Sequence, residues 1–246
     1  MTLVRDSSHV VRRVVPLPEP SKMKRYWILL LPVLLVLFQV IAVGLRPLGI
    51  RPTLSAALLT AVVADLLTVG IAFFLVARSP GNRLARLGLE VPRWKRDLLL
   101  LPIVGGVLAF VGLALADAVY ALLTGGQLPP PQAVTQALAE SEDPGLRILA
   151  VLAVGLVAPF AEEIVFRGVS FRGHRRSLGF LPAAALSAGL FSLAHLDLPH
   201  ALQLFTVGIV LAWTAERSGS ILPGMLLHAG VNLASLLLIW ESPLRS

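Results

Sequence analysis

The sequence contains no cysteine. This absence excludes disulfide bonds, thiolate metal sites, a cysteine nucleophile and S-palmitoylation. Charge is also scarce, because only 14% of the 246 residues are Asp, Glu, Lys or Arg, whereas a soluble domain contains about 25%. Hydrophobic residues make up 56% of the chain and its mean hydropathy is +0.82. We therefore predict an integral membrane protein.

Seven apolar stretches predict an all-α fold, a polytopic bundle of about seven transmembrane helices. They cover approximately 27–45, 53–77, 98–123, 146–169, 180–196, 200–216 and 221–240. A span needs about 20 apolar residues, so the last three are short enough for one to be tilted or re-entrant. Residues 1–25 are expected to form a flexible cytoplasmic tail before a retained first helix.

The basic residues, which give a net charge of +7, lie at the ends of the apolar runs. This distribution is typical of topology determinants that contact anionic membrane lipid, and no nucleic-acid partner is expected. Basic loops at 78–96 and 172–176 would share one side with the N-terminal tail, and the acidic 124–145 loop would lie opposite. The positive-inside rule then places the N-terminus in the cytoplasm of a bacterial plasma membrane and residues 82–96 along the interface.

Two adjacent carboxylates, Glu162 and Glu163, interrupt an apolar run between residues 148 and 167. A carboxylate in hydrocarbon is costly unless it is paired, hydrated or neutralised, and such residues usually mark function. Neighbouring helix positions point about 100° apart. Glu163 and Arg167 are four residues apart, which predicts a supporting ion pair between them. Glu162 is then free to face a cavity.

Other polar side chains in the second half of the chain are predicted to lie at the depth of Glu162. His195 ends the fifth apolar stretch, while His228 and Asn232 share one face of the last. A rise of about 1.5 Å per residue places all of them in the cytoplasmic half of the bilayer. Asp65 and Asp117 have no partner in this scheme and are interpreted as residues of the bundle interior or a cavity.

The chemistry that suits these side chains is hydrolysis. A buried carboxylate can take a proton from water and pass it to a leaving amine, while a histidine beside it shares the proton or orients the water. An Asn amide and a second imidazole can donate hydrogen bonds to an oxyanion. Alternatively, Glu162, His195 and His228 could hold one divalent metal ion such as zinc; the order of the residues does not separate the two mechanisms. The sequence lacks a His-Glu-x-x-His helix and a Gly-x-Ser-x-Gly nucleophile elbow.

Three motifs resemble those of a known family. Residues 162–167 match Glu-Glu-x-x-x-Arg, residues 191–195 match Phe-x-x-x-His, and residues 228–232 match His-x-x-x-Asn. This order is similar to that of the CPBP intramembrane proteases, which include the type II CAAX prenyl endopeptidases and bacteriocin-immunity proteins. The resemblance implies that residues 145–240 form a CAAX-protease-like catalytic core. Residues 26–144 would then be N-terminal transmembrane helices without a motif.

The resemblance implies an endopeptidase in which Glu162 and His195 activate water and His228 and Asn232 bind the oxyanion. Its substrate would be a membrane-associated peptide or lipidated protein, such as a prenylated CAAX protein. Members have been described both as metalloproteases and as metal-free glutamate-dependent enzymes. Two other functions stay open. A proton-coupled transporter would also use buried Glu and His, and an immunity protein could keep the motifs without catalysis.

Overall fold

The computed structural model describes residues 32–33, 53–77, 82–92 and 94–241, and these are helical with no strand among them. The first helices are α2 (Leu54–Ala77), α3 (Arg83–Leu87), α4 (Asp97–Thr124) and α5 (Ala133–Ala139). Five segments then join end to end: α6 (Pro144–Ala150), η2 (Val151–Val157), α7 (Ala158–Glu162), η3 (Glu163–Phe171) and α8 (Arg172–Leu178). The last helices are α9 (Phe180–Ala194), α10 (Ala201–Ser218) and α11 (Leu222–Glu241). The predicted all-α fold is confirmed.

The predicted spans agree with these helices, with one correction. Residues 172–176, predicted as a loop, belong to α8, because η3 continues into it without a break. The described part of residues 82–96, which are predicted to lie along the interface, contains the short helix α3. The predicted span at 27–45 and the tail at 1–25 lie outside the described residues, apart from residues 32–33.

Four helices of the described part are long and apolar enough to cross a membrane. They are Leu54–Leu75, Asp97–Thr124, Pro144–Leu178 and Leu222–Glu241. Helix α9 is shorter, at 15 residues. The chain is therefore an integral membrane protein, and in its bundle α9 packs against η3.

Local sequence sets the ends of several helices. The Asn82 side chain accepts hydrogen bonds from the backbone N–H groups of Leu84 and Ala85, which caps α3. Asp143 caps α6 in the same way through Gly145 N–H. Gly125 ends α4 with a left-handed φ of 74°, a conformation that glycine adopts without steric cost.

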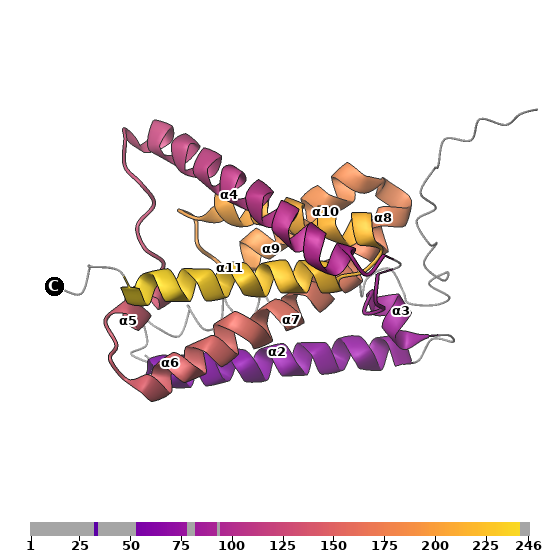
Figure 1. Cartoon of the computed structure of the whole chain (residues 1–246), viewed down its shortest axis with the longest axis horizontal. Helices are drawn as coiled ribbons and strands as arrows, with labels where there is room; N and C mark the ends of the chain where they lie inside the picture. Colours follow the sequence, from indigo (N-terminus) through magenta and orange to yellow (C-terminus); the bar gives the residue numbers. More distant parts are fainter. Residues whose placement is uncertain (1–31, 34–52, 78–81, 93, 242–246) are drawn as a thin grey trace, which may run out of the picture.

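The basic and acidic connections lie at opposite ends of the molecule (Figure 1). Helices α3 and α8 lie together at one end, where Arg172 donates hydrogen bonds to Ala85 O at 3.2 Å and Gly219 O at 3.0 Å. Helices α5 and α6 lie at the other end. This separation agrees with the predicted alternation of charge.

Small residues allow the helices around η3 to pack closely. The main core holds Ala183, Ala184, Ala212 and Ala215 together with the rings of Phe166, Phe171 and Phe191. Gly208 of α10 approaches α9 so closely that a Cβ built on it would lie 2.7 Å from Ala188 Cβ. Close backbone approach through small residues is a common way to join membrane helices.

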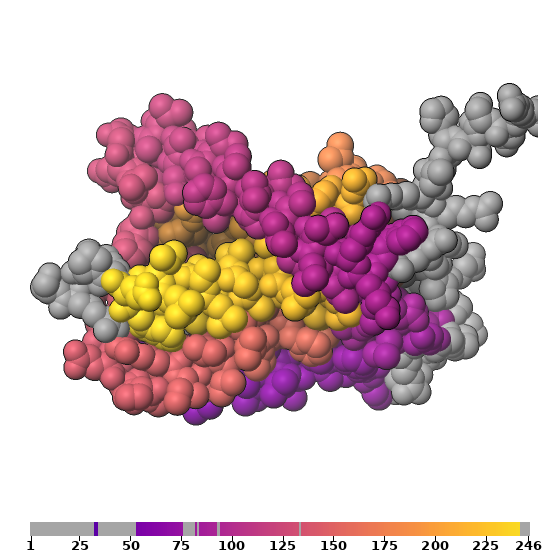
Figure 2. Space-filling model, in the orientation of Figure 1, coloured from indigo at the N-terminus to yellow at the C-terminus, as the bar shows by residue number. Residues whose placement is uncertain are grey.

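Helix α4 is the most exposed of the long helices. Leu122 and Leu123 near its end are 84% and 82% exposed, as expected for side chains that face lipid. Figure 2 shows a hollow between the C-terminal half of α4 and α11. Most of the buried polar side chains of the described residues lie elsewhere, on η3, α9, α10 and α11.

Candidate active site

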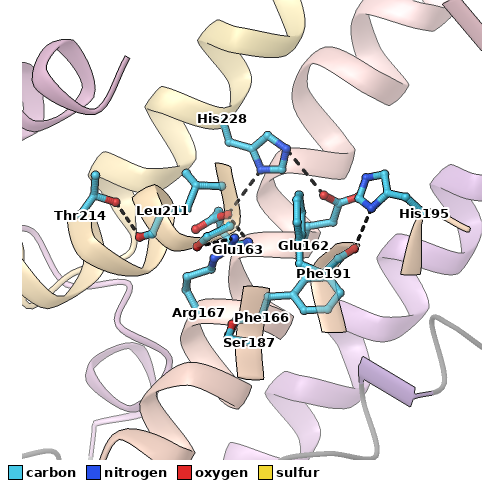
Figure 3. A network of polar contacts seen from close by, with 11 residues as sticks. Glu162, Glu163, Phe166, Arg167, Ser187, Phe191, His195, Leu211, Thr214 and His228 are labelled. Atoms are coloured by element: carbon cyan, nitrogen blue, oxygen red, sulfur yellow. Dashed lines mark hydrogen bonds and ion pairs between the residues drawn. The ribbon is translucent and has the colours of Figure 1, made fainter. Parts of the chain in front are cut away.

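A fully buried ion pair forms the base of the polar cluster (Figure 3). Arg167 Nη1 lies 2.8 Å from Glu163 Oε1, and both side chains are 0% exposed. Arg167 also donates a hydrogen bond to Gly208 O at 3.2 Å, and its guanidinium lies 4.6 Å from the centre of the Phe191 ring. The ion pair that the four-residue spacing predicts is therefore present, and α9 and α10 enclose it.

His228 lies between the two glutamates. Its Nε2 is 3.6 Å from Glu162 Oε2, and its Nδ1 is 3.4 Å from Glu163 Oε1. Neither contact has hydrogen-bond geometry, and Nδ1 has no hydrogen-bond partner within the described residues. The expected division, in which Glu163 belongs only to Arg167, is thus incomplete. Glu163 contacts both Arg167 and His228. The His228 imidazole therefore lies between the buried ion pair and the more accessible carboxylate of Glu162.

The Phe191 ring joins both histidines to this cluster. Its centre lies 4.8 Å from that of His195 and 5.6 Å from that of His228. His195 Nδ1 is 2.8 Å from Phe191 O. Because a carbonyl only accepts hydrogen bonds, Nδ1 must carry the hydrogen, which leaves Nε2 of a neutral ring as an acceptor. In the view of Figure 3 the Glu162 carboxylate is drawn between the two imidazoles.

Solvent access distinguishes the two glutamates. The Glu162 side chain is 17% exposed, whereas Glu163 is fully buried. His195 is half-buried. The structure thus leaves Glu162 partly open and encloses Glu163, which makes Glu162 the carboxylate of the pair that is suited to proton transfer with a water molecule.

The structure places the remaining polar residues in different surroundings. Asn232 Nδ2 donates a hydrogen bond to Val154 O at 2.8 Å. Asp65 on α2 lies close enough to Glu162 for their charges to interact. Asp117 accepts a hydrogen bond from Gln203 of α10, a partner that sequence reasoning missed. Asp65 thus adjoins the cluster, whereas Asp117 joins α4 to α10.

The sequence also predicts a possible divalent metal ion at Glu162, His195 and His228. Within the described part of the chain, no three His, Asp or Glu side chains are grouped so that they could hold a metal ion. Of the three predicted ligands, His228 and Glu162 face each other, with 3.6 Å between Nε2 and Oε2 and no hydrogen bond between them. Zinc binding by Glu162, His195 and His228 stays a prediction, which metal analysis of the purified protein and sensitivity to chelators would test.

Known proteins share the part of the chain that carries this cluster. Residues 144–234 match the family described as type II CAAX prenyl endopeptidase Rce1-like. An Escherichia coli protein named "Uncharacterized 24.3 kDa protein" is 30% identical over 156 residues, which cover 58% of this chain and 71% of that protein. The chain belongs to the Rce1-like family. It is thus an integral membrane protein of an intramembrane protease family.

A second relative comes from Bacillus subtilis (strain 168) and is named "Putative membrane peptidase YdiL". It is 29% identical over 84 residues, which make up 34% of each chain. The chain thus spans about a third of the length of this relative. No solved structure matches the chain.

Sequence reasoning missed two further residues of this Rce1-like site. Phe191 was identified only as the first residue of a motif, but its ring contacts Arg167, His195 and His228. Gly224 of α11 lies so close to Glu163 that a Cβ built on it would be 2.9 Å from Glu163 Oε2. Four residues separate Gly224 from His228, and this helical spacing was the available signal for a position facing the site.

We expect Gly224→Ala to destabilise the Rce1-like protein. The added methyl group would press on a carboxylate that is fully buried and held by Arg167, and overpacking of this kind costs about 1–3 kcal/mol. Gly230→Ala is the matched control on the same helix, because a Cβ there meets nothing within 4 Å. Thermal unfolding in detergent should show a lower midpoint for Gly224→Ala only. Equal midpoints would contradict the close packing described here.

Proposed function

We infer that the chain is an intramembrane endopeptidase in which Glu162 activates the attacking water. The observation that carries this proposal is the contrast between the adjacent glutamates. Glu162 is accessible and lies 3.6 Å from His228, whereas Glu163 is buried against Arg167. Two carboxylates of one helix therefore have different tasks, one facing water and one inside the protein. Membership of the Rce1-like family supports hydrolysis as the reaction.

The proposed reaction uses the groups in the following order. Glu162, assisted by His195, takes a proton from water as the oxygen attacks the peptide carbonyl. The negative charge that develops on the carbonyl oxygen is stabilised by a hydrogen bond from His228, whose Nε2 faces Glu162. The carbon–nitrogen bond then breaks, and Glu162 returns the proton to the leaving amine. One Asn232 amide hydrogen is bound to Val154 O, so only the other is free to assist at the oxyanion.

The substrate class follows from the family and from the location of the site. The site lies within membrane-spanning helices, so the scissile bond must belong to a peptide held at the membrane. A prenylated CAAX-type protein or another lipidated peptide meets this requirement. We further propose a bacterial plasma membrane, with the N-terminus and the basic end of the bundle in the cytoplasm.

The arrangement favours hydrolysis over the two alternatives. A proton-coupled transporter requires polar groups along a path through the membrane, whereas Glu162, Glu163, Arg167 and His228 gather around one point. A non-catalytic immunity protein would have no need for a water-accessible glutamate beside an imidazole. The cluster therefore supports an active enzyme.

A peptide-cleavage assay tests the function. Purified wild type should cut a fluorogenic farnesylated peptide faster than the same peptide without the lipid. His228→Ala should lose about 100-fold or more in kcat, as enzymes do when an oxyanion donor is removed. The thermal midpoint of each preparation checks that it is folded. The proposal is wrong if a folded wild type cuts no peptide of a varied panel, or if His228→Ala cuts normally.

A further inference from the structure

The helix that carries the glutamates is irregular just before them. Residues Val151–Val157 form the π-helix η2, in which backbone N–H groups bind the carbonyl five residues earlier. At the end of η2, Ala158 N–H binds Ala153 O. In a regular α-helix the same N–H would bind Val154 O. The α-helical donor for Val154 O is thus committed elsewhere.

The other possible donor for Val154 O is also missing. Five residues after Val154 comes Pro159, and proline has no backbone N–H. Val154 O therefore lacks both the donor that an α-helix would supply and the donor that a π-helix would supply. Within a membrane no bulk water replaces them, and an unmet carbonyl is costly.

Helix α11 supplies the missing hydrogen bond. Asn232 Nδ2 donates to Val154 O at 2.8 Å. The two helices are in tight contact at this point, because a Cβ built on Gly155 would lie 2.5 Å from Leu233 Cδ2. The absence of a side chain at Gly155 thus lets α11 approach the irregular segment closely enough for the amide to reach the carbonyl.

We propose that Asn232 is a positioning residue whose amide takes the place of the N–H that Pro159 lacks. Four residues before Asn232, the same helix presents His228 to Glu162, which lies eight residues after Val154. The two helices are thus antiparallel here, since Val154 precedes Glu162 in the chain whereas its partner Asn232 follows His228. The Asn232 hydrogen bond therefore fixes where Glu162 lies relative to the His228 imidazole. The effect of Asn232 on catalysis rests on the proposed function, whereas its hydrogen bond to Val154 O is independent of that function.

A similar arrangement is present further along the same helix. In the π-helix η3, Ser187 of α9 donates a hydrogen bond to Phe166 O at 2.7 Å. A side chain of a facing helix thus binds a carbonyl in each π-segment. Because η2 and η3 flank α7, these bonds hold the helix on both sides of Glu162.

A rescue experiment tests the proposal. Asn232→Leu removes the donor and keeps the branched arrangement of four heavy atoms in the side chain. We expect kcat to fall by about tenfold or more, since small misplacements of catalytic groups have effects of this size, with KM little changed. Pro159→Ala adds an N–H that can serve Val154 O, either directly or by letting Ala158 return to it. The double variant Asn232→Leu/Pro159→Ala should therefore regain most of the lost activity and thermal stability.

The control places the same proline change elsewhere. Pro102 lies inside α4, and Asn232→Leu/Pro102→Ala should show no rescue. If Asn232→Leu is fully active, the proposal is overturned. It is also overturned if Asn232→Leu is impaired and Pro159→Ala restores neither activity nor the thermal midpoint, and the amide then acts on the substrate. The thermal midpoints test whether the Asn232 hydrogen bond stabilises the protein, even if Asn232→Leu folds poorly. They remain a valid test if no peptide is cut, a result that would refute only the proposed function.

Discussion

Glu162→Gln should abolish most of the peptide hydrolysis while leaving the protein folded. The amide keeps the shape of the carboxylate but cannot take a proton from water, and a general base contributes about 100- to 10,000-fold in rate. The Glu162 side chain is partly exposed and forms no hydrogen bond within the described residues, so the loss of its charge should cost little stability. The measurement is kcat with the lipidated peptide, together with the thermal midpoint.

A second glutamine substitution provides the comparison. Glu142 lies exposed in the acidic connection before α6, and Glu142→Gln removes the same charge far from the cluster. Its kcat should equal that of wild type. A Glu162→Gln enzyme that is as active as Glu142→Gln would remove Glu162 from the mechanism, and the accessible carboxylate would then need another explanation.

The sequence allowed much of the fold to be predicted because hydrocarbon imposes simple requirements. Apolar runs separated by charges and turn residues correspond to helices, and α2, α4 and α11 begin and end within one or two residues of the predicted spans. The predicted loop at 172–176 was wrong for a physical reason. A run of charged residues can continue a helix when its side chains find partners, and Arg175 binds Glu216 while Arg172 binds Ala85 O and Gly219 O.

The sequence predicted the contact within one helix of the site but not the contacts between helices. Helical spacing predicted the ion pair between Glu163 and Arg167, because both residues lie on one helix. It did not reveal that His228 lies between both glutamates, since that contact depends on how α11 crosses the helix of the glutamates. The same limit applies to Asn232, whose partner is a backbone carbonyl freed by a π-helix and by Pro159.

Loss of the buried arginine should be the most destabilising single change that we predict. Arg167→Met leaves Glu163 without its cation in a fully buried position, and removal of one partner from a buried pair costs about 3–5 kcal/mol. The variant also loses the hydrogen bond to Gly208 O and the contact with the Phe191 ring. Thermal or chemical unfolding in detergent would measure the effect.

A second Arg–Glu ion pair, which is partly exposed, allows the effect of burial on stability to be separated from the effect of charge. Arg175 lies 2.7 Å from Glu216, but these side chains are 34% and 18% exposed, and pairs open to solvent contribute about 0–1 kcal/mol. Arg175→Met should therefore be mild. Glu163→Gln combined with Arg167→Met should be less harmful than Arg167→Met alone, because no stranded carboxylate remains. If Arg167→Met and Arg175→Met destabilised the protein equally, the buried pair would not be the support on which His228 and the accessible Glu162 depend.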